Sequence, residues 1–267
     1  MWDFETDPEY QKVLDWADEF VREEIEPLDL AFPHQQFMPL EGKRREAIDP
    51  LKQEVRRRGL WATHLGAELG GQGYGQLKLA LLNEILGRSQ WAPIIFGCQA
   101  PDTGNAEIIA HYGTDDQKQR YLRPLLNGEL FSCYSMTEPH AGADPTMFTT
   151  SAVRDGEDWV INGWKFFSSN AATSSFLIVM EVTNPNVSAY QGMSMFLVPT
   201  DTPGVKIERN IGLYGEQAGQ GSHALIHYDN VRVPGEALLG GEGQAFVIAQ
   251  TRLGGGRIHH AMRTIGL

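Results

Sequence analysis

The first 128 residues carry apolar positions at the spacing of an α-helix. Val13, Trp16 and Phe20 recur every three or four residues with charges between them, which predicts a helix from residue 7 to about residue 32. The same reasoning predicts three further helices, at 44–58, 76–87 and 102–112. A capping box at 114–117 opens one more helix, which Asn127-Gly128 ends. We therefore expect an N-terminal helical domain over residues 1–128.

From residue 129 the pattern changes to short apolar runs separated by Gly, Pro and Asn. These runs predict strands at 131–136, 151–154, 159–161, 165–168, 176–182, 192–199, 205–209, 223–228 and 231–233. Asn162-Gly163 lies between two of them and predicts a hairpin turn, with the flanking strands paired. Many short strands with such turns favour a small antiparallel β-barrel or sandwich over residues 129–238, so the fold class is α+β. After Pro234 the helical period returns.

Polar residues gather where two of the predicted strands end. Thr137 follows an apolar run, and Pro139 must end regular pairing, so the hydroxyl and N–H of Thr137 are left for a ligand. A strand that simply ends in a loop is the alternative. The second place is the end of 165–168, where Ser168 and Ser169 follow Phe166 and Phe167. Alternation along a strand predicts that one of the two rings is buried in the core and that only one of the two serine hydroxyls faces a ligand.

Composition narrows the class of protein. The 267 residues carry a formal net charge of -12 with a pI of about 5.1, which argues against binding to nucleic-acid phosphates. Cys98 and Cys133 lack metal-ligand spacing, so neither a metal site nor a disulfide framework is expected. No signal sequence or apolar run of membrane-spanning length is present, which predicts a cytoplasmic protein without a membrane span.

The two polar segments resemble the acyl-CoA dehydrogenase family. Residues 134–144 match its Tyr-x-x-Thr-Glu-Pro-x-Ala-Gly-x-Asp pattern, and residues 162–170 match its Asn-Gly-x-Lys-x-aromatic-x-Ser/Thr-Asn pattern. The resemblance continues through 212–215, 226–234 and 253–267, and the last stretch is most similar to family members ten and eleven. The resemblance implies that residues 239–267 begin a C-terminal helical bundle whose remainder is absent from this chain.

The resemblance also implies FAD as cofactor and gives roles to six residues. In the family's arrangement Tyr134, Met136 and Thr137 lie along the pyrimidine side of the flavin, and the Thr137 hydroxyl and amide are donors. Ser169 takes the position of the hydroxyl that contacts N5. Phe167 stands in the place of a tryptophan beside the ring system, and Ser168 contributes backbone next to it.

On the substrate side the resemblance implies an acyl-CoA and points to two positions. Ala143 stands where many family members have a serine that contacts the thioester or the CoA arm, so no side-chain hydrogen bond is available there. Arg257 aligns with an arginine near CoA, but Gly254 replaces its acidic partner. The family's catalytic glutamate lies in the C-terminal domain or directly before the arginine, where this chain has Gly256. No residue of the chain is therefore a candidate base.

The expected activity is α,β-dehydrogenation of an acyl-CoA to trans-2-enoyl-CoA, with electrons passed to an electron-transfer flavoprotein by a homodimer or homotetramer. Two alternatives stay open. One is a truncated or non-catalytic subunit without a complete flavin site, and the other is a flavin oxidase on the same fold.

Overall fold

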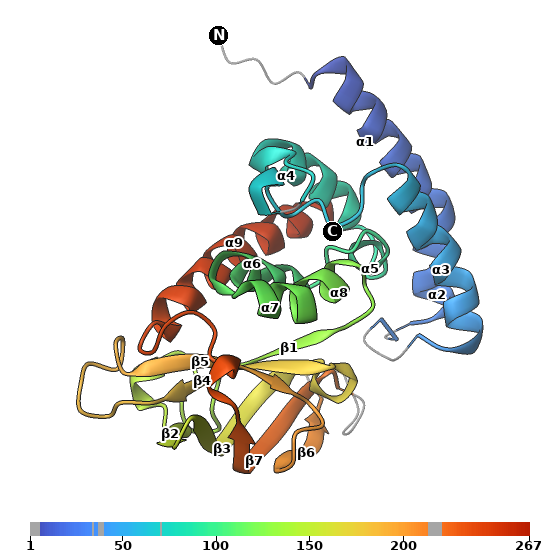
Figure 1. Cartoon of the computed structure of the whole chain (residues 1–267). Helices are drawn as coiled ribbons and strands as arrows, with labels where there is room; N and C mark the ends of the chain where they lie inside the picture. The colour runs from blue at the N-terminus through green and yellow to red at the C-terminus, as the bar shows by residue number, and fades with distance from the viewer. Residues whose placement is uncertain (1–5, 34, 37–39, 70, 213–220) are drawn as a thin grey trace. The chain divides into compact units, whose positions relative to one another are not determined.

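The structure is a computed structural model that describes residues 6–33, 35–36, 40–69, 71–212 and 221–267 (Figure 1). The chain forms two compact units. The first contains Met1–Thr103 and Gly254–Leu267, and the second contains Gly104–Leu253. Within the described residues no helix is long and apolar enough to cross a membrane.

The first unit is helical. Its elements are α1 (Pro8–Phe20), the π-helical turn η1 (Val21–Ile25), α2 (Glu26–Ala31), α3 (Gly42–Arg57), the 3₁₀ turn η2 (Ala67–Leu69), α4 (Gly75–Leu86) and α5 (Ala92–Ile95). The helix predicted from residue 7 to 32 is the continuous run from α1 to α2, and Asp7 caps it by accepting from Tyr10 N at 2.8 Å. Its apolar face packs into a core that includes Trp91 and Phe96. The sequence reasoning missed the short helix α5.

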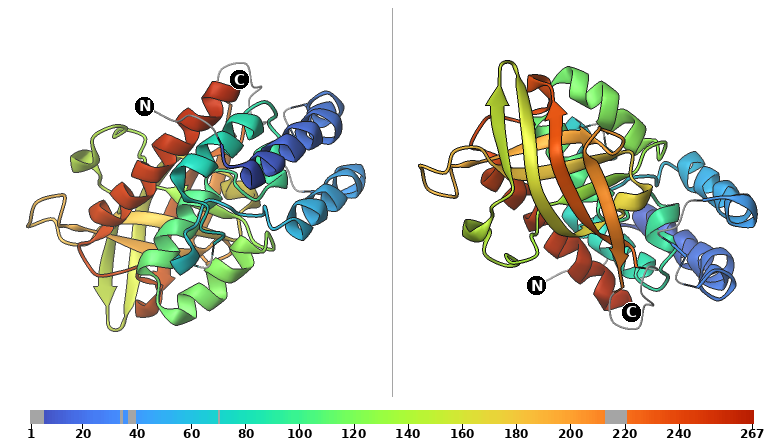
Figure 2. Two further views of the ribbon diagram at one scale, coloured as in Figure 1. Left: turned by 90° about the horizontal axis from the view of Figure 1, so that it is seen from above. Right: turned by 90° about the horizontal axis from the view of Figure 1, so that it is seen from below.

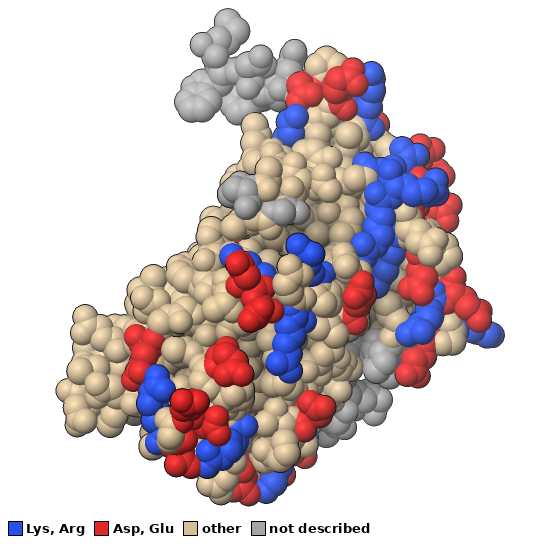
Figure 3. Space-filling model, viewed as in Figure 1, with Lys and Arg blue, Asp and Glu red and all other residues tan. Residues whose placement is uncertain are grey.

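Charged side chains of both signs cover the outer faces of these helices. On α3, Glu54 pairs with both Arg57 and Arg58. Acidic and basic side chains are interspersed over the face of the molecule in Figure 3. The helix charges therefore form a solvated surface, as the sequence pattern indicates.

The second unit joins a helical run to a β-sheet. α6 (Asp102–Tyr112) leads into α7 (Asp115–Gln117), η3 (Lys118–Leu122) and α8 (Arg123–Leu126). The predicted capping box at Thr114 is confirmed, with the Thr114 hydroxyl accepting from Gln117 N and the Gln117 side chain accepting from Thr114 N. Gly128, with φ of +69°, follows the end of the run.

In the described part of the chain seven strands build the sheet: β1 (Ser132–Ser135), β2 (Ser151–Asp155), β3 (Asp158–Ser169), β4 (Phe176–Val182), β5 (Met193–Pro199), β6 (Val205–Ile211) and β7 (His223–Val233). The strand order is β1-β4-β2-β3-β7-β6, and β5 pairs with β4. Strands β2, β3, β7 and β6 run side by side in Figure 2. Short 3₁₀ turns, η4 (Pro145–Met147), η5 (Ala171–Thr173) and η6 (Gly235–Ala237), join the strands and lead to α9 (Ala245–Gly266).

The predicted fold class, a helical N-terminal part followed by a small β domain, is confirmed. The sheet is mixed rather than antiparallel throughout, because β1 and β4 pair in parallel. The apolar inner face includes Trp159, Phe196 and Tyr228.

The predicted hairpin turn at Asn162-Gly163 is wrong, because both flanking runs belong to the single strand β3. The turn lies instead at Gly156-Glu157, between β2 and β3, with φ of +67° at Gly156. Gly163 marks a bulge, with φ of +142° and Thr150 so close that a Cβ would lie 2.6 Å from its methyl group. A glycine is needed there for the close approach of Thr150.

Candidate functional site

Hydrogen bonds join the ends of the two polar segments singled out in the sequence. The Phe166 N–H, on β3, donates to the Thr137 carbonyl, which follows β1, over 2.8 Å. A second contact joins the same two strands, because the hydroxyls of Ser135 on β1 and Ser168 on β3 lie 3.0 Å apart. Two stretches about thirty residues apart in sequence therefore meet at one place. We call Thr137, Phe167 and Ser169 together the Thr137 corner.

A bulge in β3 shapes this corner. Lys165 pairs with Ile226 of β7, and Ser168 pairs with Ala224. Between these two pairs β3 has two residues and β7 has one, so β3 contains one extra residue. Phe167 adopts φ of +53°, in the left-handed region that is uncommon for an aromatic residue. The bulge therefore directs the Phe167 side chain differently from a regular pleated strand.

The prediction that one of the two phenylalanine rings is buried in the core is wrong. Phe166 is half-buried and Phe167 is 43% exposed, and their ring centroids are 4.1 Å apart. The prediction relied on strict alternation, which the extra residue interrupts. Lys165 and Ser168, three positions apart, are both fully buried instead.

The two serines have different surroundings. The Ser168 hydroxyl is buried and bonded to that of Ser135, which also accepts from the Tyr228 hydroxyl at 2.9 Å. Ser169 is half-buried, and its Oγ lies 2.8 Å from Nδ1 of His223. The sequence reasoning did not single out His223. The pairing of Ser169 with His223 across β3 and β7 would have found it, but the β3 bulge conceals that register.

Some donors on and just after β1 lack hydrogen-bond partners among the described residues. Within the described part of the chain, neither the N–H nor the hydroxyl of Thr137 has a hydrogen-bond partner. The Tyr134 hydroxyl is buried and also lacks a partner among the described residues, while the Arg252 guanidinium lies 3.8 Å from the ring centroid. Burial raises the pKa of Tyr134 to about 12, with Arg252 opposing the shift. These are neutral donors, which suits a planar ring that gains negative charge.

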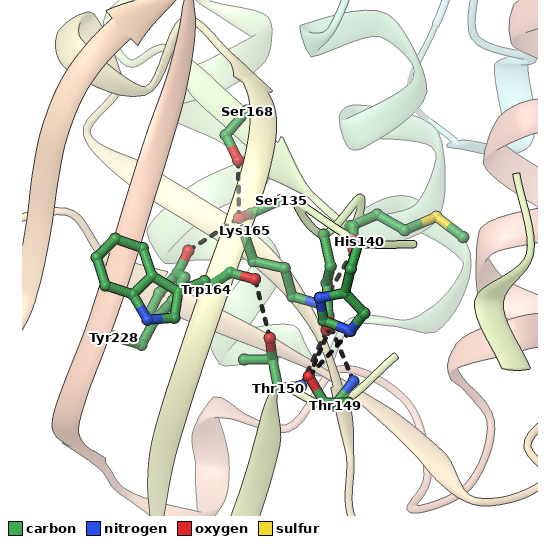
Figure 4. Close-up of polar contacts among 10 residues, drawn as sticks. Ser135, His140, Thr149, Thr150, Trp164, Lys165, Ser168 and Tyr228 are labelled. Carbon is green, nitrogen blue, oxygen red and sulfur yellow. Dashed lines mark hydrogen bonds and ion pairs between the residues drawn. The ribbon is translucent and has the colours of Figure 1, made fainter. Parts of the chain in front are cut away.

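A buried charged group supports the corner from inside the sheet (Figure 4). Lys165 Nζ, fully buried, donates to the Met136 carbonyl and to Glu138 Oε1, each over 3.0 Å. Glu138 also accepts from the backbone N–H groups of Thr149 and Thr150, at 2.8 and 3.0 Å. Glu138 therefore caps backbone N–H groups and also pairs with Lys165, and the sequence pattern did not reveal that ion pair.

The electrostatics of this group follow from burial and pairing. Burial alone would raise the pKa of Glu138, but the Lys165 charge and the threonine hydrogen bonds hold it below its usual value. Glu181 on β4 is also fully buried, and both its carboxyl oxygens lack hydrogen-bond partners in the described residues. Burial raises the pKa of Glu181 to about 8, against the opposing charge of Lys165. We call Glu138, Lys165 and Glu181 the buried charge network.

The remaining predicted positions are described one at a time. Met136, which follows β1, is half-buried. Ala143 lies exposed in the loop before η4, where the Asp144 side chain accepts from Thr146 N at 2.9 Å. Arg257 is an exposed residue of α9. The motif at 212–215 lies outside the described residues from position 213 onward.

Comparison with known proteins agrees with this architecture. The acyl-CoA dehydrogenase N-terminal domain matches residues 7–129, and the acyl-CoA dehydrogenase middle domain matches residues 133–231. An acyl-CoA dehydrogenase family protein from Mycobacterium abscessus has a solved structure that superimposes with a TM-score of 0.87 at 38% identity, over 98% of this chain and 68% of that one. The chain therefore belongs to the acyl-CoA dehydrogenase family.

Two curated relatives show which members of the family the chain is similar to. The protein named Probable acyl-CoA dehydrogenase FadE2, from Mycobacterium tuberculosis, is 49% identical over 223 residues, which is 82% of this chain and 54% of that protein. Acyl-CoA dehydrogenase family member 11 from Gallus gallus is 44% identical over 229 residues, 84% of this chain and 29% of that protein. The predicted resemblance to members ten and eleven is confirmed. The chain spans about half the length of the first relative and under a third of the second.

Proposed function

We propose that the protein is an FAD-dependent acyl-CoA dehydrogenase that converts an acyl-CoA thioester to the trans-2-enoyl-CoA and passes electrons to an electron-transfer flavoprotein. The observation that carries the proposal is the bond from Phe166 N to the Thr137 carbonyl, which brings the two flavin-side motifs of the family to one corner. Membership of a family whose members are generally flavoproteins supports the cofactor.

Each residue of the corner has a role that its surroundings support. Bound FAD would supply the acceptor for two electrons at N5, with negative charge developing near N1 and the C2 oxygen. The unpartnered N–H and hydroxyl of Thr137 would stabilise that charge, with Tyr134 and Met136 beside them. Phe167, largely exposed at the bulge, would pack beside the ring system. The Ser169 hydroxyl would hold N5 in register, whereas Ser168 would contribute its backbone, since its hydroxyl is fully buried and bonded to that of Ser135.

On the substrate side the chain supplies binding groups rather than the base. We place Ala143 near the thioester and CoA arm through its backbone, and Arg257 near the CoA portion, where its exposed guanidinium could meet a phosphate. Gly256 occupies the position at which some family members carry the catalytic glutamate. We therefore assign the α-proton abstraction to no residue of this chain.

The test is reconstitution with FAD of the purified full-length protein, in the form that carries the catalytic base. A flavin absorption band that bleaches anaerobically when an acyl-CoA is added, with electrons recovered by an electron-transfer flavoprotein, is the expected result. A protein that retains no flavin would contradict the proposal and favour the non-catalytic subunit. Peroxide formation in air at the rate of substrate oxidation would indicate an oxidase instead. We further propose a cytoplasmic homodimer or homotetramer, which size-exclusion chromatography and fractionation would check.

A further inference from the structure

We propose that His223 is a positioning residue that sets the direction in which the Ser169 hydroxyl donates its proton. The inference rests on the proposed function, because that function places Ser169 beside N5 of a bound flavin.

The contact between the two side chains is built into the sheet. Ser169 Oγ lies 2.8 Å from His223 Nδ1, and the two residues face each other across the β3–β7 ladder. The next backbone bond, from Asn170 N to the Ser222 carbonyl at 2.7 Å, fixes the pair from the other side. Both side chains are half-buried. The separation of Oγ and Nδ1 is therefore determined by backbone pairing and not by two mobile surface side chains.

A second contact limits rotation of the imidazole. The Phe167 ring lies edge-on to the His223 ring, with centroids 6.2 Å apart and an interplanar angle of 79°. Phe167 is itself held by the β3 bulge and by its contact with Phe166. One histidine thus touches both side chains that β3 contributes to the Thr137 corner.

The chemistry of the pair follows from counting protons. A serine hydroxyl has one proton to donate and two lone pairs that can accept. The hydrogen bond to His223 therefore decides whether the Ser169 proton remains available to donate to a ligand. If Nδ1 of His223 carries a hydrogen, it donates to Ser169 Oγ, and the Ser169 proton is directed to another acceptor. If Nδ1 is bare, it accepts the Ser169 proton, and Oγ is left to accept from elsewhere.

This choice matters at a flavin because N5 accepts a hydrogen bond in the oxidised ring and donates one in the reduced ring. A hydroxyl whose direction can reverse with the imidazole tautomer is able to serve both states. A serine without such a neighbour would keep its proton wherever the ligand or water directs it. His223 therefore acts on the flavin through Ser169 without touching it.

The test uses FAD-loaded variants and two readouts besides turnover, the FAD dissociation constant and the flavin midpoint potential. His223→Leu removes Nδ1, and His223→Asn places an amide atom at the same number of bonds from Cα. The matched control is His227→Leu, a histidine of the same strand whose ring stacks on Trp164 with centroids 4.0 Å apart. Ser169→Ala and its combination with His223→Leu complete a double-mutant cycle.

We expect His223→Leu and Ser169→Ala each to weaken FAD binding roughly five- to tenfold, the worth of one hydrogen bond. Both should move the midpoint potential in the same direction. The double variant should be no weaker than Ser169→Ala alone, because His223 has nothing left to direct. His223→Asn should recover most of the loss, and His227→Leu should match the wild type.

Additive losses in the double variant, or equal behaviour of His223→Leu and His227→Leu, would overturn the inference and leave the proposed function standing. A wild type that binds no FAD would overturn both. If His223→Leu does not fold, the ¹⁵N resonance of His223 Nδ1 decides instead. That resonance should shift on FAD addition in the wild type and stay in place in Ser169→Ala, and an unmoved wild-type resonance would refute the role of His223.

Discussion

The buried charge network and the Thr137 corner lie close together in the second unit, and they differ in burial, charge and hydrogen bonding. The side chains of Lys165 and Glu138 have no exposed surface, and they satisfy each other together with backbone groups. The Thr137 corner is uncharged and partly exposed, and the Thr137 donors lack partners among the described residues. They are joined at Met136, whose carbonyl accepts from Lys165 one residue before Thr137.

This difference suggests that the buried charges serve the stability of the fold and that the donors of the Thr137 corner serve ligand binding. A buried charge that is left unpaired is costly, so the pair of Lys165 and Glu138 must form before any ligand arrives. A donor intended for a ligand must stay unpaired in the empty protein, and it is least costly when it is neutral and partly solvated. The following predictions test whether the two groups divide these tasks, from the largest expected effect to the smallest.

The largest effect should come from breaking the ion pair. Glu138→Ala leaves the Lys165 ammonium buried without its carboxylate and should lower the free energy of unfolding by about 3–5 kcal/mol. Urea denaturation would measure it. The exposed pair of Lys206 and Asp229 is the control, and Lys206→Ala should leave the urea midpoint nearly unchanged.

A paired replacement sharpens this prediction. Glu138→Leu combined with Lys165→Met removes both charges and should cost less than the sum of the single changes. It also deprives the Met136 carbonyl of its donor, so FAD binding should weaken in the double variant even where the fold survives. If FAD affinity were unchanged in a folded double variant, the network would have no part in supporting the corner.

The second effect is a dependence of stability on pH caused by Glu181. Its folded pKa of about 8 lies above that of an unfolded glutamate, so the folded state binds a proton more tightly between roughly pH 4.5 and 8. The free energy of unfolding should therefore fall as pH rises through this window, by about 1.4 kcal/mol per pH unit well below pH 8. Unfolding curves from pH 6.5 to 8 would reveal the slope.

Glu181→Gln is the matched control, because the amide has the same shape and no charge to acquire. Its stability should be nearly flat over the same range, and the difference between the two proteins isolates the carboxyl. His64, whose ring nitrogens are buried, has its pKa lowered to about 3 by desolvation and adds an opposite slope below its ordinary pKa. The comparison is therefore made above pH 6.5. Parallel curves for the two proteins would show that Glu181 is ionised in the fold.

The sequence predicts many of the helices and strands, and particular residues show which features of the fold it does not predict. The capping box at Thr114 and the strand at 176–182 depend only on local pattern, and both are found as expected. The turn at Gly163 was misplaced because its glycine serves a close approach by Thr150, which is distant in sequence. Local spacing does not report such tertiary contacts.

The same limit applies to the candidate site. The motifs point to Thr137 and Ser169 as candidates, because hydroxyl and amide donors suit the flavin that we propose. Glu138, Lys165 and His223 make their contacts with residues distant in the sequence. The one-residue bulge at Phe167 shifts the register that brings Ser169 opposite His223. The register across β3 and β7 is set by packing of whole strands, so these supporting residues become visible only in the structure.

The smallest effect should come from the corner itself. Thr137→Val keeps the shape and the N–H of Thr137 but removes the hydroxyl, so FAD binding should weaken roughly five- to tenfold. The free energy of unfolding of the FAD-free protein should not fall, because the hydroxyl has no partner among the described residues. Thr202→Val provides the contrast, since its hydroxyl donates to the Pro199 carbonyl at 2.7 Å and should matter for stability alone. Equilibrium urea unfolding and FAD titration of both variants would separate the two cases. A loss of stability in Thr137→Val as large as in Thr202→Val would mean that the Thr137 hydroxyl is part of the fold and not reserved for a ligand.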